Sequence, residues 1–209
     1  NNIHRSGVAL EGLIADILDV SRLEAGQLEV EHSLFSAREC INDLSDLYQQ
    51  QQPNFRTLFE FADGSVTYHN FKDREHFIQS YPFVPYQFEL FQAAIKNLSR
   101  HSAFEGKHSS VGERSMLGVF QQVAIGIKGH QLGDLATFDQ MFEGIRTALK
   151  GSIQSSVLRA ENTLTNDFAL RVLKALFLVK YVKEFKPTVR NICVLMQDNF
   201  GTSVSALKA

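Results

Sequence analysis

The chain has 209 residues, of which 44% are hydrophobic and 11% aromatic, and its formal net charge is -2. A chain of this length and composition can bury a hydrophobic core, which argues against disorder throughout, although the length also allows two small domains. No apolar run reaches the roughly 18 residues of a membrane span, and the start lacks the plan of a signal peptide, so we expect a soluble, cytoplasmic protein without membrane insertion.

Charge is distributed unevenly along the chain. Residues 1–52 carry nine acidic and three basic residues, which leaves fourteen acidic and eighteen basic residues for 53–209. The two parts therefore have formal charges of about -6 and +4, and the sign changes at the sequence YQQQQPNF. Together with the change of sequence character described below, this predicts a joint at 49–53, which we interpret as a fusion joint between two incomplete segments.

The acidic segment begins with a predicted amphipathic helix. Apolar residues recur at steps of three and four over 8–23, which places them on one side of a helix, and Gly26 stands where a C-terminal cap belongs. A capping box at 36–39 then predicts a second helix through Cys40, Leu44 and Leu47 up to the glutamines.

The run SGVALEGLIADILDVSRLEAGQLEVEHSLFSARECI resembles part of the bacterial sensor histidine kinases, most specifically over 13–31. In that family this part contains the second helix of the dimerisation hairpin and the connection to the ATP-binding domain. The resemblance implies a dimerisation helix and connector over 1–48. The family's phosphoacceptor motif and nucleotide boxes do not occur in this sequence. His4 lies at the start of the second-helix match, so the resemblance does not carry the phosphoacceptor role over to it. The implied dimer interface consists of Leu10, Leu13, Ile14, Ile17 and Leu18.

Beyond Pro53 the pattern changes to one short hairpin followed by helices. Aromatic residues at 59 and 61, a turn at Asp63 and Gly64, and apolar residues at 66 and 68 predict a β-hairpin near 59–68. Pro85 can begin a helix, and capping boxes at 110–113 and 137–140 begin others, the last with a possible extension toward Leu158.

The C-terminal part carries the most apolar stretch of the chain. Residues 168–182 are apolar on nearly every face, which predicts a helix packed between others, and Thr188 after Pro187 begins another helix. The predicted fold is therefore mainly α, a helical bundle with one small β-hairpin.

A second resemblance covers about residues 53–209. The sequences YPFVPYQF and GERSML are its most specific motifs, and the stretch resembles an internal region of BrxC, the large P-loop ATPase of the BREX phage-defence system. Members of that family are AAA+-like, ATP-binding proteins of a DNA-associated antiviral assembly. The resemblance implies a helical lid-like region over 54–160 and a truncated, winged-helix-like part over 161–209.

No complete catalytic motif occurs in the chain, so whether it is part of an enzyme stays open. The phosphate-binding sequence GxxxxGK[ST] is absent, and we expect ATP and Mg²⁺ to belong to the parent families and not to be bound by this chain alone. Arg114 of GERSML is a candidate nucleotide-sensing arginine, since lids of AAA+ relatives often offer one. The alternative is that Arg114 pairs with a surface acid.

A cluster of bases between 168 and 192 is the candidate DNA-binding site. The cluster can neutralise phosphates and give salt-dependent affinity, but a solvated face of a very apolar helix is an alternative of similar weight. The residues concerned are Lys174, Lys180, Lys183, Lys186 and Arg190, with Arg171 beside them.

Cysteine and histidine spacing predicts no metal site. Cys40 and Cys193 are far apart and are interpreted as two buried thiols, and the histidines lack partners at ligand spacing.

Two hypotheses for the function of the chain are left. The first is a non-catalytic assembly and regulatory portion of a BREX-type ATPase, contacting itself, other defence-complex subunits or DNA. The alternative is a dimerising fragment of a sensor histidine kinase, from two-component signalling, fused to a helical domain.

Overall fold

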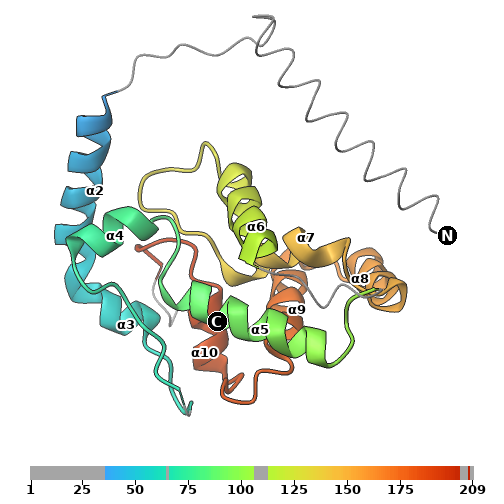
Figure 1. The fold of residues 1–209 in the computed structure, drawn as a ribbon. Helices are drawn as coiled ribbons and strands as arrows, with labels where there is room; N and C mark the ends of the chain where they lie inside the picture. Colours follow the sequence, from blue (N-terminus) through green and yellow to red (C-terminus); the bar gives the residue numbers. More distant parts are fainter. Residues whose placement is uncertain (1–35, 65, 106–112, 203–206, 208–209) are drawn as a thin grey trace, which may run out of the picture. The chain divides into compact units, whose positions relative to one another are not determined.

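The computed structural model describes residues 36–64, 66–105, 113–202 and 207. In the helix Glu113–Gly126, side chains are described from Met116 onward. This part of the chain is mainly α-helical, as predicted (Figure 1). The helices are α2 (Ala37–Gln51), α3 (Phe55–Phe59), α4 (Arg74–Ser80), α5 (Tyr86–Arg100), α6 (Glu113–Gly126), α7 (Met141–Arg146), α8 (Gly151–Thr163), α9 (Asp167–Val179) and α10 (Val189–Leu195). Two 3₁₀ turns, η1 (Gln52–Asn54) and η2 (Phe138–Gln140), precede α3 and α7.

The chain divides into two compact units, Asn1–Ala37 and Arg38–Ala209. Almost all of the first unit lies outside the described residues, so the predicted dimerisation helix and its interface residues do too. The second unit includes the predicted boundary between 160 and 161, which falls within α8. None of the helices in the described part of the chain is both long and apolar enough to cross a bilayer.

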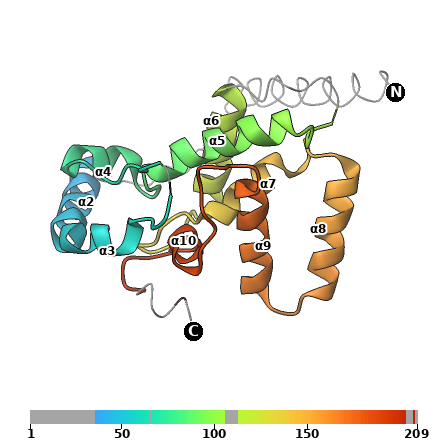
Figure 2. The same ribbon diagram turned by 90° about the horizontal axis from the view of Figure 1, so that it is seen from below.

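Helix continues through the predicted joint at 49–53. Gln49, Gln50 and Gln51 form the last turn of α2, and Gln52 begins η1. Pro53 stands in the first turn of η1, where its missing N–H costs no helical hydrogen bond. Leu47 is buried, and the Tyr48 ring lies 5.7 Å from each of the Phe55 and Phe77 rings. The end of α2 is thus packed into the core that α3 and α4 complete, and these three helices lie together in both Figure 1 and Figure 2.

The β-hairpin predicted near 59–68 is wrong in its strands and right in its turn. Phe59 is the last residue of α3, and no strand occurs in the described residues of this segment. Asp63 has a φ of 60°, the left-handed conformation that a tight turn requires. The Phe61 and Tyr68 rings lie 5.4 Å apart, edge to face, so aromatic packing takes the place of a backbone ladder.

The motif YPFVPYQF forms a buried junction within the core. Phe83, Val84, Tyr86 and Gln87 are all at most 7% exposed. The Tyr86 hydroxyl donates to the Val194 carbonyl at 3.1 Å, and Gln87 donates from Nε2 to the Ala136 carbonyl at 2.7 Å. As predicted, Pro85 precedes the first residue of a helix, α5, whose Leu90, Phe91, Ala94, Ile95 and Leu98 are buried. The motif therefore joins α5 to the segment before η2 and to α10.

The helix predicted between 168 and 182 is only partly enclosed. α9 buries Ala175, Leu178 and Val179 and packs against α5, α7, α10 and η2. Its other face leaves Phe168, Leu173 and Leu176 between 37% and 39% exposed. α9 is therefore packed between other helices, as predicted, but one of its faces is left uncovered.

Helix starts and stops in the second half follow local signals. The capping box of Thr137 and Gln140 is formed at η2, and the Thr188 side chain accepts from the Asn191 N–H at the start of α10. The helix after Gln140 does not continue to Leu158. α7 ends at Arg146, and a new helix, α8, begins at Gly151. The winged-helix-like character of 161–209 stays a prediction.

Candidate functional site

The predicted site residues have different surroundings, and some lie outside the described part of the chain. The segment with Leu10, Leu13, Ile14, Ile17 and Leu18 is outside it, and so is the side chain of Arg114, whose backbone lies in the first turn of α6. The bases at 171–190 are described, and they divide into those that bind groups within the chain and those that are exposed.

Lys174 is held in an ion-pair network that joins α7, α8 and α9. Its Nζ atom lies 2.6 Å from Glu143 Oε1 and 3.2 Å from Glu161 Oε1, and its side chain is only 13% exposed. Arg146 donates from Nη1 to Glu161 Oε1 at 2.7 Å and also contacts the second carboxylate oxygen. The hydrogen bonds from Arg146 lower the pKa of Glu161, and Lys174 adds to that shift.

The network explains how α8 is attached. Only Val157 of α8 is buried, so few apolar contacts hold this helix. Its last turn is tied instead through Glu161 to a cation on α7 and a cation on α9. Sequence spacing could show the neighbouring pair of Glu143 and Arg146 on α7 but not Glu161, because that residue comes from the next helix.

Arg171 and Arg190 also bind groups within the chain. Arg171 donates from Nε to the buried Asp139 at 3.2 Å and from Nη2 to the Thr137 hydroxyl at 3.1 Å, which joins α9 to η2. Arg190 donates to the carbonyl oxygens of Thr57 and Glu60 at the end of α3. These two arginines and Lys174 stabilise the fold, so the basic cluster offers fewer cations to a phosphate than its sequence indicates.

The remaining three lysines are exposed and follow one another around the C-terminal end of α9. Lys180, Lys183 and Lys186 are all solvent-accessible, and Lys180 Nζ lies 5.0 Å from the centre of the Tyr181 ring. This ring also stacks on His101, with ring centroids 4.0 Å apart. The structure thus leaves these three cations exposed within a short segment, one of them over an aromatic ring.

An apolar groove lies between α8 and α9, helices that stand side by side in Figure 2. The groove has a volume of about 450 Å³, and we call it the α8–α9 groove. Its lining residues are Ser152, Ile153, Ser156, Val157 and Ala160 on α8, and Leu173, Lys174, Phe177 and Lys180 in and just after α9. Its walls are small or apolar, and its charged lining groups are both cationic.

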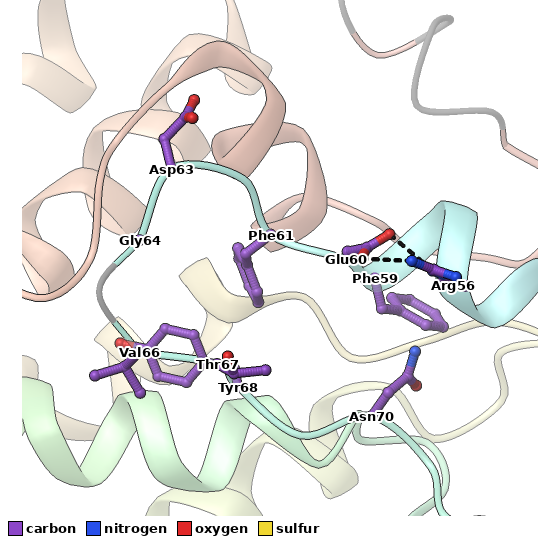
Figure 3. Close-up of a pocket in the computed structure, with 10 residues that line it drawn as sticks. All are labelled: Arg56, Phe59, Glu60, Phe61, Asp63, Gly64, Val66, Thr67, Tyr68 and Asn70. Atoms are coloured by element: carbon purple, nitrogen blue, oxygen red, sulfur yellow. Dashed lines mark hydrogen bonds and ion pairs between the residues drawn. The ribbon is translucent and has the colours of Figure 1, made fainter.

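A second cavity, of about 410 Å³, lies beside the turn at Asp63 and is shown in Figure 3. The Phe61 and Tyr68 rings pack edge to face there, whereas the Asp63 side chain points away from them (Figure 3). Burial raises the pKa of the Tyr68 phenol, and the nearby carboxylates of Glu184 and Glu89 raise it further, so this hydroxyl stays protonated. No histidine or cysteine is among the residues described as lining this cavity, and its charged lining residues are Arg56, Glu60 and Asp63.

Metal-binding groups are absent from the part of the chain that the structure describes, where no three His, Cys, Asp or Glu side chains come together. His69 contacts Glu89 at 2.5 Å, and His101 stacks on Tyr181. Cys193 is buried as predicted, but Cys40 is exposed, because it lies on the solvent side of α2.

Comparison with known proteins finds no family model that matches the chain and no solved structure that matches it.

Proposed function

We propose that this chain is a non-catalytic assembly and regulatory portion of a BREX-type, AAA+-like phage-defence ATPase, which contacts neighbouring subunits and DNA. The resemblance over 53–209 supports the family. The architecture supports an assembly role, since large apolar side chains stay exposed on α6 and beside the α8–α9 groove.

The observation that carries the assembly role is the outer face of α6. Leu117 is 72% exposed and Ile125 62% exposed, and Ala124 between them is exposed as well. These three residues, which we call the α6 face, lie within one side of the helix. Large aliphatic side chains gathered on one helix face are typical of a protein–protein interface, because burying each contributes about 1.5–3 kcal/mol.

We expect the nucleotide of the parent ATPase to be bound outside this chain. The sequence has no phosphate-binding loop, so ATP and Mg²⁺ would be bound by another part of the parent assembly. Arg114, near the start of α6, is the residue that we propose to contact a nucleotide in that assembly. Replacing it by alanine in the assembled ATPase should lower ATP turnover, and unchanged turnover would reject the sensing role.

The assembly role can be tested on the α6 face in cells that carry the complete defence system. The double variant Leu117→Glu and Ile125→Glu should lose phage protection and co-purification with partner subunits, because two carboxylates would be placed in an apolar interface. Gln122→Ala, a change at an exposed polar residue on another side of the same helix, is the matched control and should keep both. Full protection in the double variant, at normal protein abundance, would contradict the assembly role of this face.

DNA contact is proposed for the three exposed lysines Lys180, Lys183 and Lys186. Duplex binding should weaken as salt rises. Replacing all three by alanine should reduce the slope of log K against log salt by about 3, because each phosphate that a lysine neutralises contributes roughly 0.9 to that slope. Lys128→Ala, at an exposed lysine after α6, is the control. If the wild-type chain does not bind duplex DNA at low salt, the DNA contact is wrong.

A further inference from the structure

The α8–α9 groove is an apolar surface without a partner among the described residues. Leu173 on its wall is 39% exposed, and Leu176 and Phe168 on the same helix are 37% and 39% exposed. Leu158 on α8 is 53% exposed. A groove between two helices with aliphatic walls is the kind of surface that receives the apolar side of a third helix.

Charge indicates which kind of helix would fit. Lys174 and Lys180 are the charged residues that line the groove, and no carboxylate is among its lining residues. Lys174 already contacts two glutamates, whereas Lys180 is exposed. An incoming helix with acidic residues beside its apolar side would therefore be favoured over a basic one.

The chain's own N-terminal sequence has these properties. Residues 8–23 carry the predicted apolar stripe, and the acidic residues Glu11, Asp16 and Asp19 alternate with it. A helix of this length would extend about 24 Å at 1.5 Å per residue, close to the roughly 20 Å of α8 or α9. The sequence thus contains a segment of matching length, opposite charge and complementary polarity.

We propose that the α8–α9 groove receives residues 8–23 of a second copy of this chain, and that two such contacts related by a twofold axis form a homodimer. The reciprocal arrangement buries both stripes and both grooves, as a closed, isologous dimer requires. This inference rests on the assembly role proposed above and names one surface for it, distinct from the α6 face.

Oligomeric state tests the proposal on the full chain, by sedimentation velocity over a range of protein concentrations. The wild-type chain should dimerise, and Leu173→Glu in the groove and Leu13→Glu in the N-terminal segment should each weaken the dimer by about tenfold or more. Leu132→Glu, at a leucine that is 55% exposed and belongs to neither the α8–α9 groove nor the α6 face, is the matched control and should leave the dimer intact. Far-UV circular dichroism of each variant verifies that the helices are retained.

Trapping in trans tests the contact itself. In a Cys40→Ser background, chains with Ile14→Cys are mixed with chains that carry Ser156→Cys in the groove, and they should form a disulfide-linked heterodimer. Gln121→Cys on α6 is the control position and should not cross-link.

Three results would overturn the groove contact. They are a monomeric wild-type chain, a dimer that Leu13→Glu weakens and Leu173→Glu does not, and equal cross-linking at positions 156 and 121. The second result would instead favour pairing of the N-terminal segments with each other, as in a sensor kinase. None of the three affects the test of the α6 face, so failure of this contact and failure of the proposed function are distinguishable.

Discussion

Gln87 provides the sharpest test of how the core is held together. Its side chain is 1% exposed, its Oε1 accepts from the Val84 N–H at 3.0 Å, and its Nε2 donates to the Ala136 carbonyl at 2.7 Å. The amide therefore satisfies one backbone donor and one backbone acceptor that lie far apart in the sequence. Replacing it by leucine keeps the size of the side chain and removes both hydrogen bonds.

The expected cost of Gln87→Leu follows from these two bonds. Each backbone group left buried without a partner costs about 1–3 kcal/mol, and the leucine recovers roughly 1–2 kcal/mol through its apolar surface. We expect a net decrease of about 2–3 kcal/mol in the free energy of unfolding. With a urea slope of about 2 kcal/mol per molar, the unfolding midpoint should fall by about 1–1.5 M.

Urea denaturation followed by circular dichroism measures this shift. Gln92→Leu is the matched control, because Gln92 lies on the same helix, α5, and is exposed. It should move the midpoint little, since surface substitutions usually change stability by less than about 0.5 kcal/mol. If Gln87→Leu and Gln92→Leu unfold at the same urea concentration, the reasoning from the buried amide is refuted.

Two further predictions concern packing and charge. A methyl group added at Gly144 would meet Val119 side-chain atoms at 2.7–2.8 Å, whereas one added at Gly118 would meet nothing within 4 Å. Thermal melting should therefore show that Gly144→Ala is destabilised by about 1–3 kcal/mol and that Gly118→Ala is unchanged or more stable. Equal melting temperatures for the two would contradict this packing. Because hydrogen bonds from Arg146 lower the pKa of Glu161, the pair stabilises fully above the ordinary carboxyl pKa and progressively less as pH falls through the lowered value. The stability difference between wild type and Glu161→Gln should therefore shrink in acid, and a difference independent of pH would count against the ion pair.

Local sequence signals were informative wherever a structural choice depends on neighbouring residues. Thr137 with Gln140, and Thr188 after Pro187, predicted helix starts that the structure has, because a cap is formed within a few residues of the chain. Asp63 likewise predicted a turn. The accompanying strands were wrong, because strands require a backbone partner, and here the Phe61 and Tyr68 rings pack instead.

The candidate sites were less predictable, because each depends on residues from separate helices. Lys174 and Arg190 appeared in the sequence as part of a free basic cluster, but Lys174 contacts Glu143 and Glu161, and Arg190 donates to carbonyls of the segment after Pro53. A count of charges along one segment cannot show acids and carbonyls that approach from elsewhere. The α8–α9 groove was missed for the same reason, since its two walls come from different helices.

The amino-acid sequence alone thus determined that the chain is mainly helical, where several of its helices begin, and that it lacks a phosphate-binding loop, because these depend on residue type and short spacing. Tertiary structure decided which apolar and charged side chains stay exposed. It packed YQQQQPNF into a continuous helical segment with Tyr48 against Phe55, and it left one face of α9 uncovered although its sequence is apolar almost all round. Both outcomes depend on how many helices come to surround a segment, and that is fixed only when distant parts of the chain pack together.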